Sequence, residues 1–152
     1  MSLKAGMNSP RDWLAKLEME HARLKEKVSA GDLTNFAITG YHMLEWIRKS
    51  SAAGPAAKTD LDSMYNNTDI RVCRDITNES KHFELKKDYK DRVTDKTSAI
   101  SGFGAGRFGK SDFGVGEPSI VVVLLDGARF DSLTWAERVV DAWKTFFAKH
   151  RL

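Results

Sequence analysis

Residues 104–111 read GAGRFGKS, and this stretch decides between two folds for the chain. It satisfies the phosphate-binding pattern G-x-x-x-x-G-K-[ST]. Residues 121–126, VVVLLD, follow it and look like an apolar strand that ends in a metal-binding aspartate. A true phosphate loop would make the protein an α/β nucleotide hydrolase. If the loop is only rich in glycine, the fold is instead determined by the helices on either side of it.

The sequence on either side of the motif decides against a phosphate loop. Such a loop needs a buried strand before it and a helix after it, so that backbone N–H groups point at the phosphates. Residues 95–101 are too polar for that strand, and Gly114, Gly116 and Pro118 stand where the helix would begin. No crossover helix fits before Ile120, so a parallel βαβ unit is excluded. The Gly-rich loop of residues 102–116 is predicted to join two strands, and the protein is not a P-loop NTPase.

Outside this loop the periodicity of apolar residues is mostly helical. A first helix begins at Ser9-Pro10, which combine an N-terminal cap with a proline in the first turn. A second covers residues 33–49, and a third begins at a Thr59 cap and runs to residue 83, with a break expected at residues 66–68. The pattern Thr134-x-x-Glu137 is a capping box that starts the last helix.

Two segments between the third and last helices are typical of strands. Residues 92–97 alternate weakly, and residues 119–125 are β-branched and end at an Asp-Gly turn. We therefore predict a mainly α fold: a four-helix bundle with a small antiparallel β-hairpin inserted between the third and fourth helices. Residues 1–152 form a single domain, with a helical part (9–83), a β insertion with the Gly-rich loop (84–131) and a last helix (132–152).

Composition limits the function only broadly. The 152 residues include 24 Lys and Arg against 21 Asp and Glu, a formal charge of +3, which permits a nucleic-acid partner without demanding one. A single cysteine, Cys73, excludes a disulfide framework, and there is no apolar run of signal-peptide or membrane-spanning length. We expect a cytoplasmic protein with no membrane partner.

The third predicted helix carries a polar stripe. At about 100° per residue, five side chains fall within a third of its circumference: Arg71, Arg74, Asn78, Lys81 and His82. The core side of the helix is already accounted for by apolar residues on the opposite face. The stripe is either a solvated or architectural face or a functional site, and the Asn and His favour function because both are poor helix formers.

The second helix offers a counterpart in His42 and Glu45, which lie three positions apart on one face. These residues could meet Asn78 and His82 in a hydrogen-bonded polar layer between helices. A metal site is the weaker hypothesis, because bundle metal sites use a second acidic motif that this chain lacks. We therefore predict no metal and no cofactor.

Residues 36–47 (FAITGYHMLEWI) and 73–83 (CRDITNESKHF) resemble a group of small uncharacterised bacterial proteins and, more distantly, HEPN domains. HEPN domains are helical bundles that often dimerise and include metal-independent RNases, which use an Arg and a His with four to six residues between them. The resemblance implies RNA or nucleotide binding. It gives Arg74, Asn78 and His82 catalytic roles, as stabiliser of the phosphorane, orienter of the phosphate and general acid or base respectively.

Arg74 and His82 are separated by seven residues, one more than the family pattern allows. The resemblance therefore implies weak or absent RNase activity, with Arg71, Lys81, His42 and Glu45 as binding residues. Two alternatives stay open. One is a non-catalytic interaction or structural protein whose stripe is architectural, and the other is a metal-binding bundle.

Residues 120–125 are apolar at every position, whereas a two-stranded hairpin on a bundle should alternate. Its outer face needs a cover, and an exposed apolar strand is an aggregation hazard. This pattern predicts a homodimer.

Overall fold

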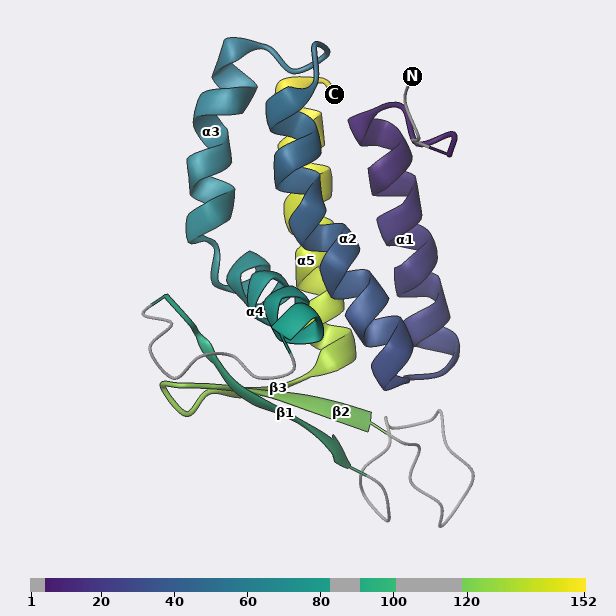
Figure 1. The fold of residues 1–152 in the computed structure, drawn as a ribbon, viewed down its shortest axis with the longest axis vertical. Coiled ribbons are helices and arrows are strands. Elements are labelled where there is room, and N and C mark those ends of the chain that lie inside the picture. The colour runs from purple at the N-terminus through teal and green to yellow at the C-terminus, as the bar shows by residue number, and fades with distance from the viewer. Residues whose placement is uncertain (1–4, 83–90, 101–118) are drawn as a thin grey trace.

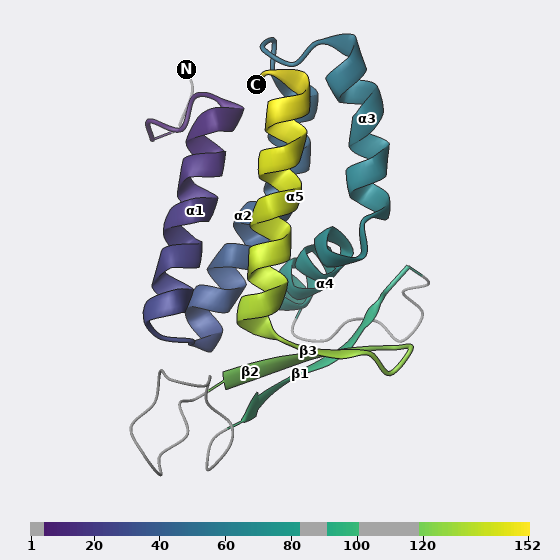
Figure 2. The same ribbon diagram turned by 180° about the vertical axis from the view of Figure 1, so that it is seen from behind.

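The computed structural model describes residues 5–82, 91–100 and 119–152, and in this part of the chain it is mainly helical (Figure 1). Five helices and a small sheet follow in this order: α1 (Pro10–Glu26), α2 (Ala30–Lys49), α3 (Pro55–Asn66), α4 (Thr68–His82), β1 (Thr94–Ile100), β2 (Ser119–Leu124), β3 (Arg129–Asp131) and α5 (Ser132–His150). The helices α1, α2, α3 and α5 run along the long axis, α4 lies below α3 and across the lower part of α2, and the sheet lies below the helices (Figures 1 and 2). No helix in the described ranges is both long and apolar enough to cross a membrane.

Local sequence signals set the first helix start as expected. The Ser9 hydroxyl accepts the Asp12 N–H at 3.2 Å, and the Asp12 carboxylate accepts the Ser9 N–H at 2.8 Å, which completes a capping box. The Ser9 hydroxyl in turn donates to the Asp12 carboxylate at 2.9 Å, and this hydrogen bond is the main reason that the pKa of Asp12 is lowered. The α1 start is therefore fixed by four consecutive residues.

The expected third helix is two helices. Asn67 ends α3, and its side-chain oxygen accepts the N–H groups of Asp69 and Ile70, so the same residue starts α4. The chain thus turns at the predicted break, and α4 leaves at a steep angle to α3 (Figure 1). The start of α3 was predicted wrongly, because the helix begins at Pro55 after a Gly54 cap and Thr59 lies inside it.

The capping box predicted at Thr134 is also wrong. Asp131 is the N-cap of α5, and its carboxylate accepts the N–H groups of Leu133 and Thr134. The cap therefore stands three residues before the predicted one, and Asp131 is also the last residue of β3. The strand therefore passes directly into the helix.

The sheet has three antiparallel strands in the order β1-β2-β3, where a two-stranded hairpin was expected. Strand β2 is central, pairing Val122 with Thr97 on one side and with Phe130 on the other. The GAGRFGKS motif lies outside the described residues, but the two strands that flank it are antiparallel and adjacent. This is the pairing expected of a hairpin and not of a βαβ unit.

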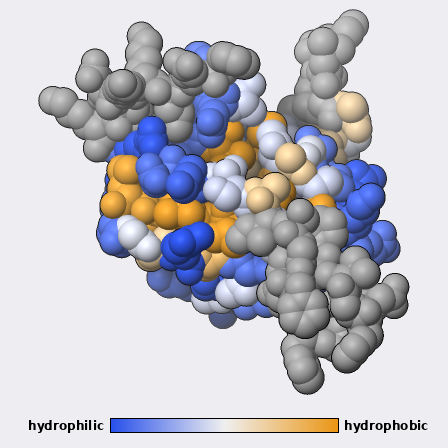
Figure 3. Space-filling model, turned by 90° about the horizontal axis from the view of Figure 1, so that it is seen from below, coloured by the Kyte–Doolittle hydropathy of each residue, from blue (hydrophilic) through white to orange (hydrophobic). Residues whose placement is uncertain are grey.

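One face of β2 belongs to the core. Ile120, Val122 and Leu124 pack into the helical core, while on the opposite face Val121 is half-buried and Val123 is buried. Beyond the strand, Leu125 is 57% exposed. Hydrophobic surface is visible from the sheet side of the molecule (Figure 3).

The close approach of α2, α4 and α5 depends on Gly40. A Cβ at this position would lie 3.1 Å from the Cys73 sulfur and 3.4 Å from a Val139 methyl. The bare backbone also lets the Gly40 carbonyl accept the Trp143 indole N–H at 3.1 Å. Gly40 therefore fixes how deeply α2 sits in the core.

Asp75 attaches the sheet to the helices. Its carboxylate is 1% exposed and accepts the backbone N–H groups of Val93 at 2.8 Å and Thr94 at 2.9 Å. The Arg74 guanidinium donates to the other carboxylate oxygen at 3.2 Å. A buried carboxylate needs such donors, since an unpaired charge away from water is costly. Asp75 therefore holds the entry of β1 against α4.

We predict that Asp75→Ala lowers the free energy of unfolding by about 3–5 kcal/mol, because it leaves two backbone N–H groups without their acceptor and removes the carboxylate that pairs with a nearly buried guanidinium. Denaturant unfolding measures the loss. Asp95→Ala is the control, because Asp95 is 46% exposed and pairs with Arg92 at 3.6 Å on the surface. The control should change stability by no more than about 0.5 kcal/mol. Equal effects of the two variants would contradict this role for Asp75.

Candidate functional site

The two ends of the polar stripe of α4 have different surroundings: the first is bonded to the backbone before β1, and the second is more open to solvent. Arg71 donates to the Asp91 carbonyl oxygen at 2.9 Å, and Arg74 donates to the same oxygen as well as to Asp75. The Arg74 side chain is only 13% exposed. Both guanidiniums therefore bind the backbone that leads into β1.

The other end of the stripe is more open. Asn78 is half-buried, and Lys81 and His82 are exposed in the last turn of α4. His82 is therefore not the buried, hydrogen-bonded residue that the architectural alternative requires. His82 stands eight positions after Arg74, a rise of about 12 Å along the helix axis. With its guanidinium already bonded, Arg74 is poorly placed to act with His82 on one phosphate.

His42 is half-buried on α2, beside the rings of Trp13 and Tyr41 at centroid distances of 6.3 and 6.2 Å. Burial lowers the pKa of His42, the positive charge of Lys81 lowers it further, and Glu45 raises it. Helix α4 packs on α2, and the charge of Lys81 acts on His42 across this contact. His42 therefore interacts electrostatically with Glu45 and Lys81, two of the other predicted binding residues.

Glu45 is exposed and forms an ion pair with Lys49 one helical turn later. The hydrogen bond from Lys49 is the main reason that the pKa of Glu45 is lowered. Glu45 is therefore a surface carboxylate with a surface partner, and not a member of a buried layer with His82.

Next to His42 lies a hollow of about 160 Å³ between α2 and α3, which we call the Tyr65 hollow. It is lined by Tyr41, His42, Leu44, Glu45, Arg48, Lys49 and Tyr65. The Arg48 guanidinium lies over the Tyr65 ring, 5.0 Å from its centroid. Cations and aromatic rings thus alternate on this surface.

Sequence reasoning missed Tyr41, Arg48 and Tyr65. Tyr41 and Arg48 lie seven positions apart on α2, a spacing that places them on one helix face, and this signal could have been read. Tyr65 packs against the core from a partly buried position. Its second contact, with Arg48, depends on how α3 packs on α2.

Two further histidines lie outside this surface. The His150 ring is 9% exposed, lies 2.8 Å from the Asp60 carboxylate and contacts the Phe146 ring at 4.6 Å, so it helps to hold α5 to α3. His21 is half-buried against Phe36. Among the described residues, no three His, Cys, Asp or Glu side chains come together as a metal site.

Comparison of the chain with protein-family models, with curated proteins and with solved structures finds no match.

We predict that the imidazole of His42 titrates below 6.5, the ordinary value for histidine, and that Lys81→Ala raises its pKa. Removing the nearby positive charge favours the protonated ring. NMR titration of the histidine ring protons measures the shift. Lys25→Ala is the matched control, since the charge of Lys25 lowers the pKa of His21 instead. Each lysine variant should move one histidine and leave the other in place.

The same shift has a consequence for stability. A histidine whose pKa is lowered on folding binds more protons in the unfolded chain, so stability falls as pH drops below about 6.5. A His42 pKa above 6.5 would contradict the effect of burial on its ring. A pKa that does not change in Lys81→Ala would contradict the interaction of Lys81 with His42.

Proposed function

We propose that this protein is a HEPN-like module that binds single-stranded RNA, without efficient cleavage, on the surface where α2, α3 and the end of α4 meet. The observation that carries the proposal is the Tyr65 hollow, with its alternating rings and cations and with Lys81 nearby. Single-stranded RNA is bound through bases that stack on aromatic or guanidinium planes and through phosphates that meet basic side chains. The hollow offers both kinds of group.

The charges around the hollow suit a polyanion. Arg48 and Lys49 come from the last turn of α2, and Lys81 comes from the last turn of α4. Glu45 is the one acidic residue that lines the hollow, and Lys49 neutralises it. A His42 ring with a lowered pKa is neutral at pH 7, so it can accept a hydrogen bond from a base or a ribose hydroxyl.

The resemblance to HEPN domains supports the RNA partner, and the environment of Arg74 favours binding over cleavage. In the family pattern the arginine stabilises charge that develops on the phosphate. Here Arg74 is nearly buried and bonds to Asp75 and the Asp91 carbonyl. It is therefore committed to the attachment of the sheet.

The architectural alternative has its own support. Arg71, Arg74 and Asp75 all bind the segment before β1, so that half of the stripe has a structural purpose with no ligand. Under this alternative the exposed half would contact another protein or nothing. RNA binding separates the two hypotheses.

We predict that a labelled single-stranded RNA of twelve nucleotides binds the protein in a salt-dependent manner, measured by fluorescence anisotropy. Lys81→Ala should weaken binding and reduce the slope of log affinity against log salt by about 0.7, the value for one phosphate contact on a single strand. Lys25→Ala is the matched control: it is also exposed and also stands in the last turn of its helix, α1. It should bind RNA like the unmodified protein.

Two results would contradict this proposal. Equal RNA affinities for the Lys81 and Lys25 variants, or no binding at low salt, would favour the architectural alternative. If the protein cleaves the RNA rapidly and His82→Ala abolishes this cleavage, the catalytic hypothesis is favoured despite the position of Arg74.

We also infer that the protein forms a homodimer through the outer face of its sheet. Strand β2 already has a partner on each side, so a second copy would pack against the face and not against the β2 backbone. Leu125 is one of two large hydrophobic side chains that stand exposed in the described part of the chain, the other being Met19 on α1. Half-buried Val121 adds apolar surface to the same side.

Light scattering of the dimer should give about twice the chain mass of 17.1 kDa. Leu125→Lys should shift the protein to the monomer, because a charge would be buried in the contact. Met19→Lys is the control and should leave the assembly unchanged. A monomer at high concentration in the unmodified protein would contradict the inference.

A further inference from the structure

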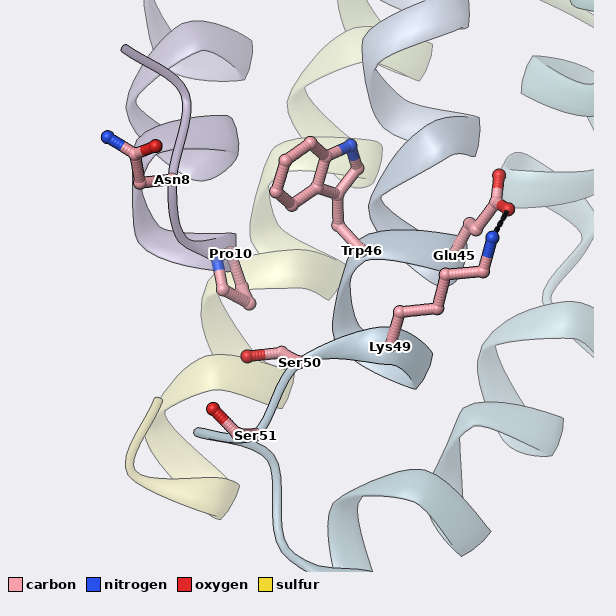
Figure 4. A pocket seen from close by; sticks show the side chains of 7 residues that line it. All are labelled: Asn8, Pro10, Glu45, Trp46, Lys49, Ser50 and Ser51. Atoms are coloured by element: carbon pink, nitrogen blue, oxygen red, sulfur yellow. Dashed lines mark hydrogen bonds and ion pairs between the residues drawn. The ribbon is translucent and has the colours of Figure 1, made fainter. Parts of the chain in front are cut away.

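A second and larger cavity lies on the other side of α2. It measures about 450 Å³, within the usual range for ligand sites, and we call it the Trp46 cavity (Figure 4). Its lining comes from three places: Asn8 and Pro10 at the start of α1, Glu45, Trp46 and Lys49 on α2, and Ser50 and Ser51 in the turn after α2.

The lining combines one large aromatic ring with small polar groups. Trp46 is half-buried, and its ring lies against that of Trp13 on α1 at a centroid distance of 5.3 Å. Asn8 and Ser51 are exposed at the rim, where an amide and a hydroxyl can exchange hydrogen bonds with a ligand. A flat ring with polar edges, such as a nucleobase, matches this combination.

The Trp46 cavity and the Tyr65 hollow are neighbours. Glu45 and Lys49 line both, so only the ion pair between these two side chains and the width of α2 separate them. A strand that left the Tyr65 hollow and crossed α2 would therefore pass Lys49 before it reached Trp46. Because Lys49 is 73% exposed at its side chain, it can turn from Glu45 to a phosphate.

We propose that the Trp46 cavity is a second base-binding subsite of the RNA surface. One base stacks on Trp46, the next lies in the Tyr65 hollow, and the phosphate between them contacts Lys49. This inference rests on the proposed function. It adds that the ligand is a strand of at least two nucleotides, and that a mononucleotide, which can fill only one subsite, binds far more weakly.

Tryptophan fluorescence gives a direct test. Of the four tryptophans, Trp135 and Trp143 are 0% exposed and out of reach of a ligand. The variant Trp13→Phe removes the other half-buried indole, whose N–H is buried without a partner, and leaves Trp46 as the reporter. An oligouridylate of eight nucleotides should quench this fluorescence at the concentrations that saturate anisotropy, and uridine monophosphate at those concentrations should not.

A second variant measures the contribution of the ring. Trp46→Leu keeps an apolar side chain against Trp13, and it should weaken oligouridylate binding about tenfold, as expected for the loss of one stacked base. Thermal melting checks that this variant is folded. Trp13→Phe is the matched control and should bind within about twofold of the unmodified protein, an effect well below that of one lost stack.

The outcomes separate the two proposals. If RNA binds and Lys81→Ala weakens it, but Trp46 is not quenched and Trp46→Leu binds normally, the second subsite is wrong and the proposed function stands. If uridine monophosphate quenches Trp46 as well as the octamer does, the two-nucleotide requirement is wrong. If the octamer does not bind at all, the proposed function and this inference fall together. If Trp46→Leu does not fold, the quenching of Trp46 in the Trp13→Phe variant still shows whether a base binds in the Trp46 cavity.

Discussion

The buried carboxylate of Asp75 is the constraint on which the arrangement of the two halves depends. It accepts two consecutive backbone N–H groups at the entry of β1 and is neutralised by Arg74 on its own helix. Because these donors come from both α4 and the sheet, α4 cannot shift without breaking several charged hydrogen bonds at once. The position of β1 then sets β2 through the ladder, and β2 delivers its apolar face to the core.

Helix α2 packs in the core with one face and carries polar and aromatic side chains on the other, because the helical period places the two sets of residues on opposite sides. Its inner face includes Gly40 and Leu44, and Gly40 lets the backbone approach α4 and α5 closely. Its outer face carries His42, Glu45, Trp46 and Lys49, one or two turns apart. Since the inner face is tightly packed, the outer side chains stand on a rigid element, and a binding surface needs such support.

The polar stripe on α4 agrees in one half with the architectural hypothesis and in the other half with the ligand-binding hypothesis. The half that holds Arg71 and Arg74 is committed to the backbone before β1, as the architectural hypothesis requires. The half that holds Lys81 and His82 is exposed, and the charge of Lys81 acts on His42, as a ligand-binding hypothesis requires. One helix can do both because Asp91 covers only part of its length. The two halves differ in their surroundings: the Arg74 guanidinium bonds to the backbone before β1, and His82 is exposed in the last turn of the helix.

The sequence by itself determined the elements whose signals are local. The Ser9 cap, the break at Asn67 and the β-branched strand at residues 119–125 each depend on a few adjacent residues, and the structure has all three. The same reasoning chose the wrong cap for α5, because Asp131 acts as a cap only once β3 has placed it at the helix start.

Tertiary structure alone decided the role of Asp75 and the contact between Arg48 and Tyr65. A helical period says which side chains share a face, but not what that face will meet. The partners of Asp75 lie 18 and 19 residues away, and those of the Tyr65 hollow lie on separate helices. Such contacts form only when the helices and the sheet pack together, and the spacing of residues within one helix does not say which other element that helix will contact.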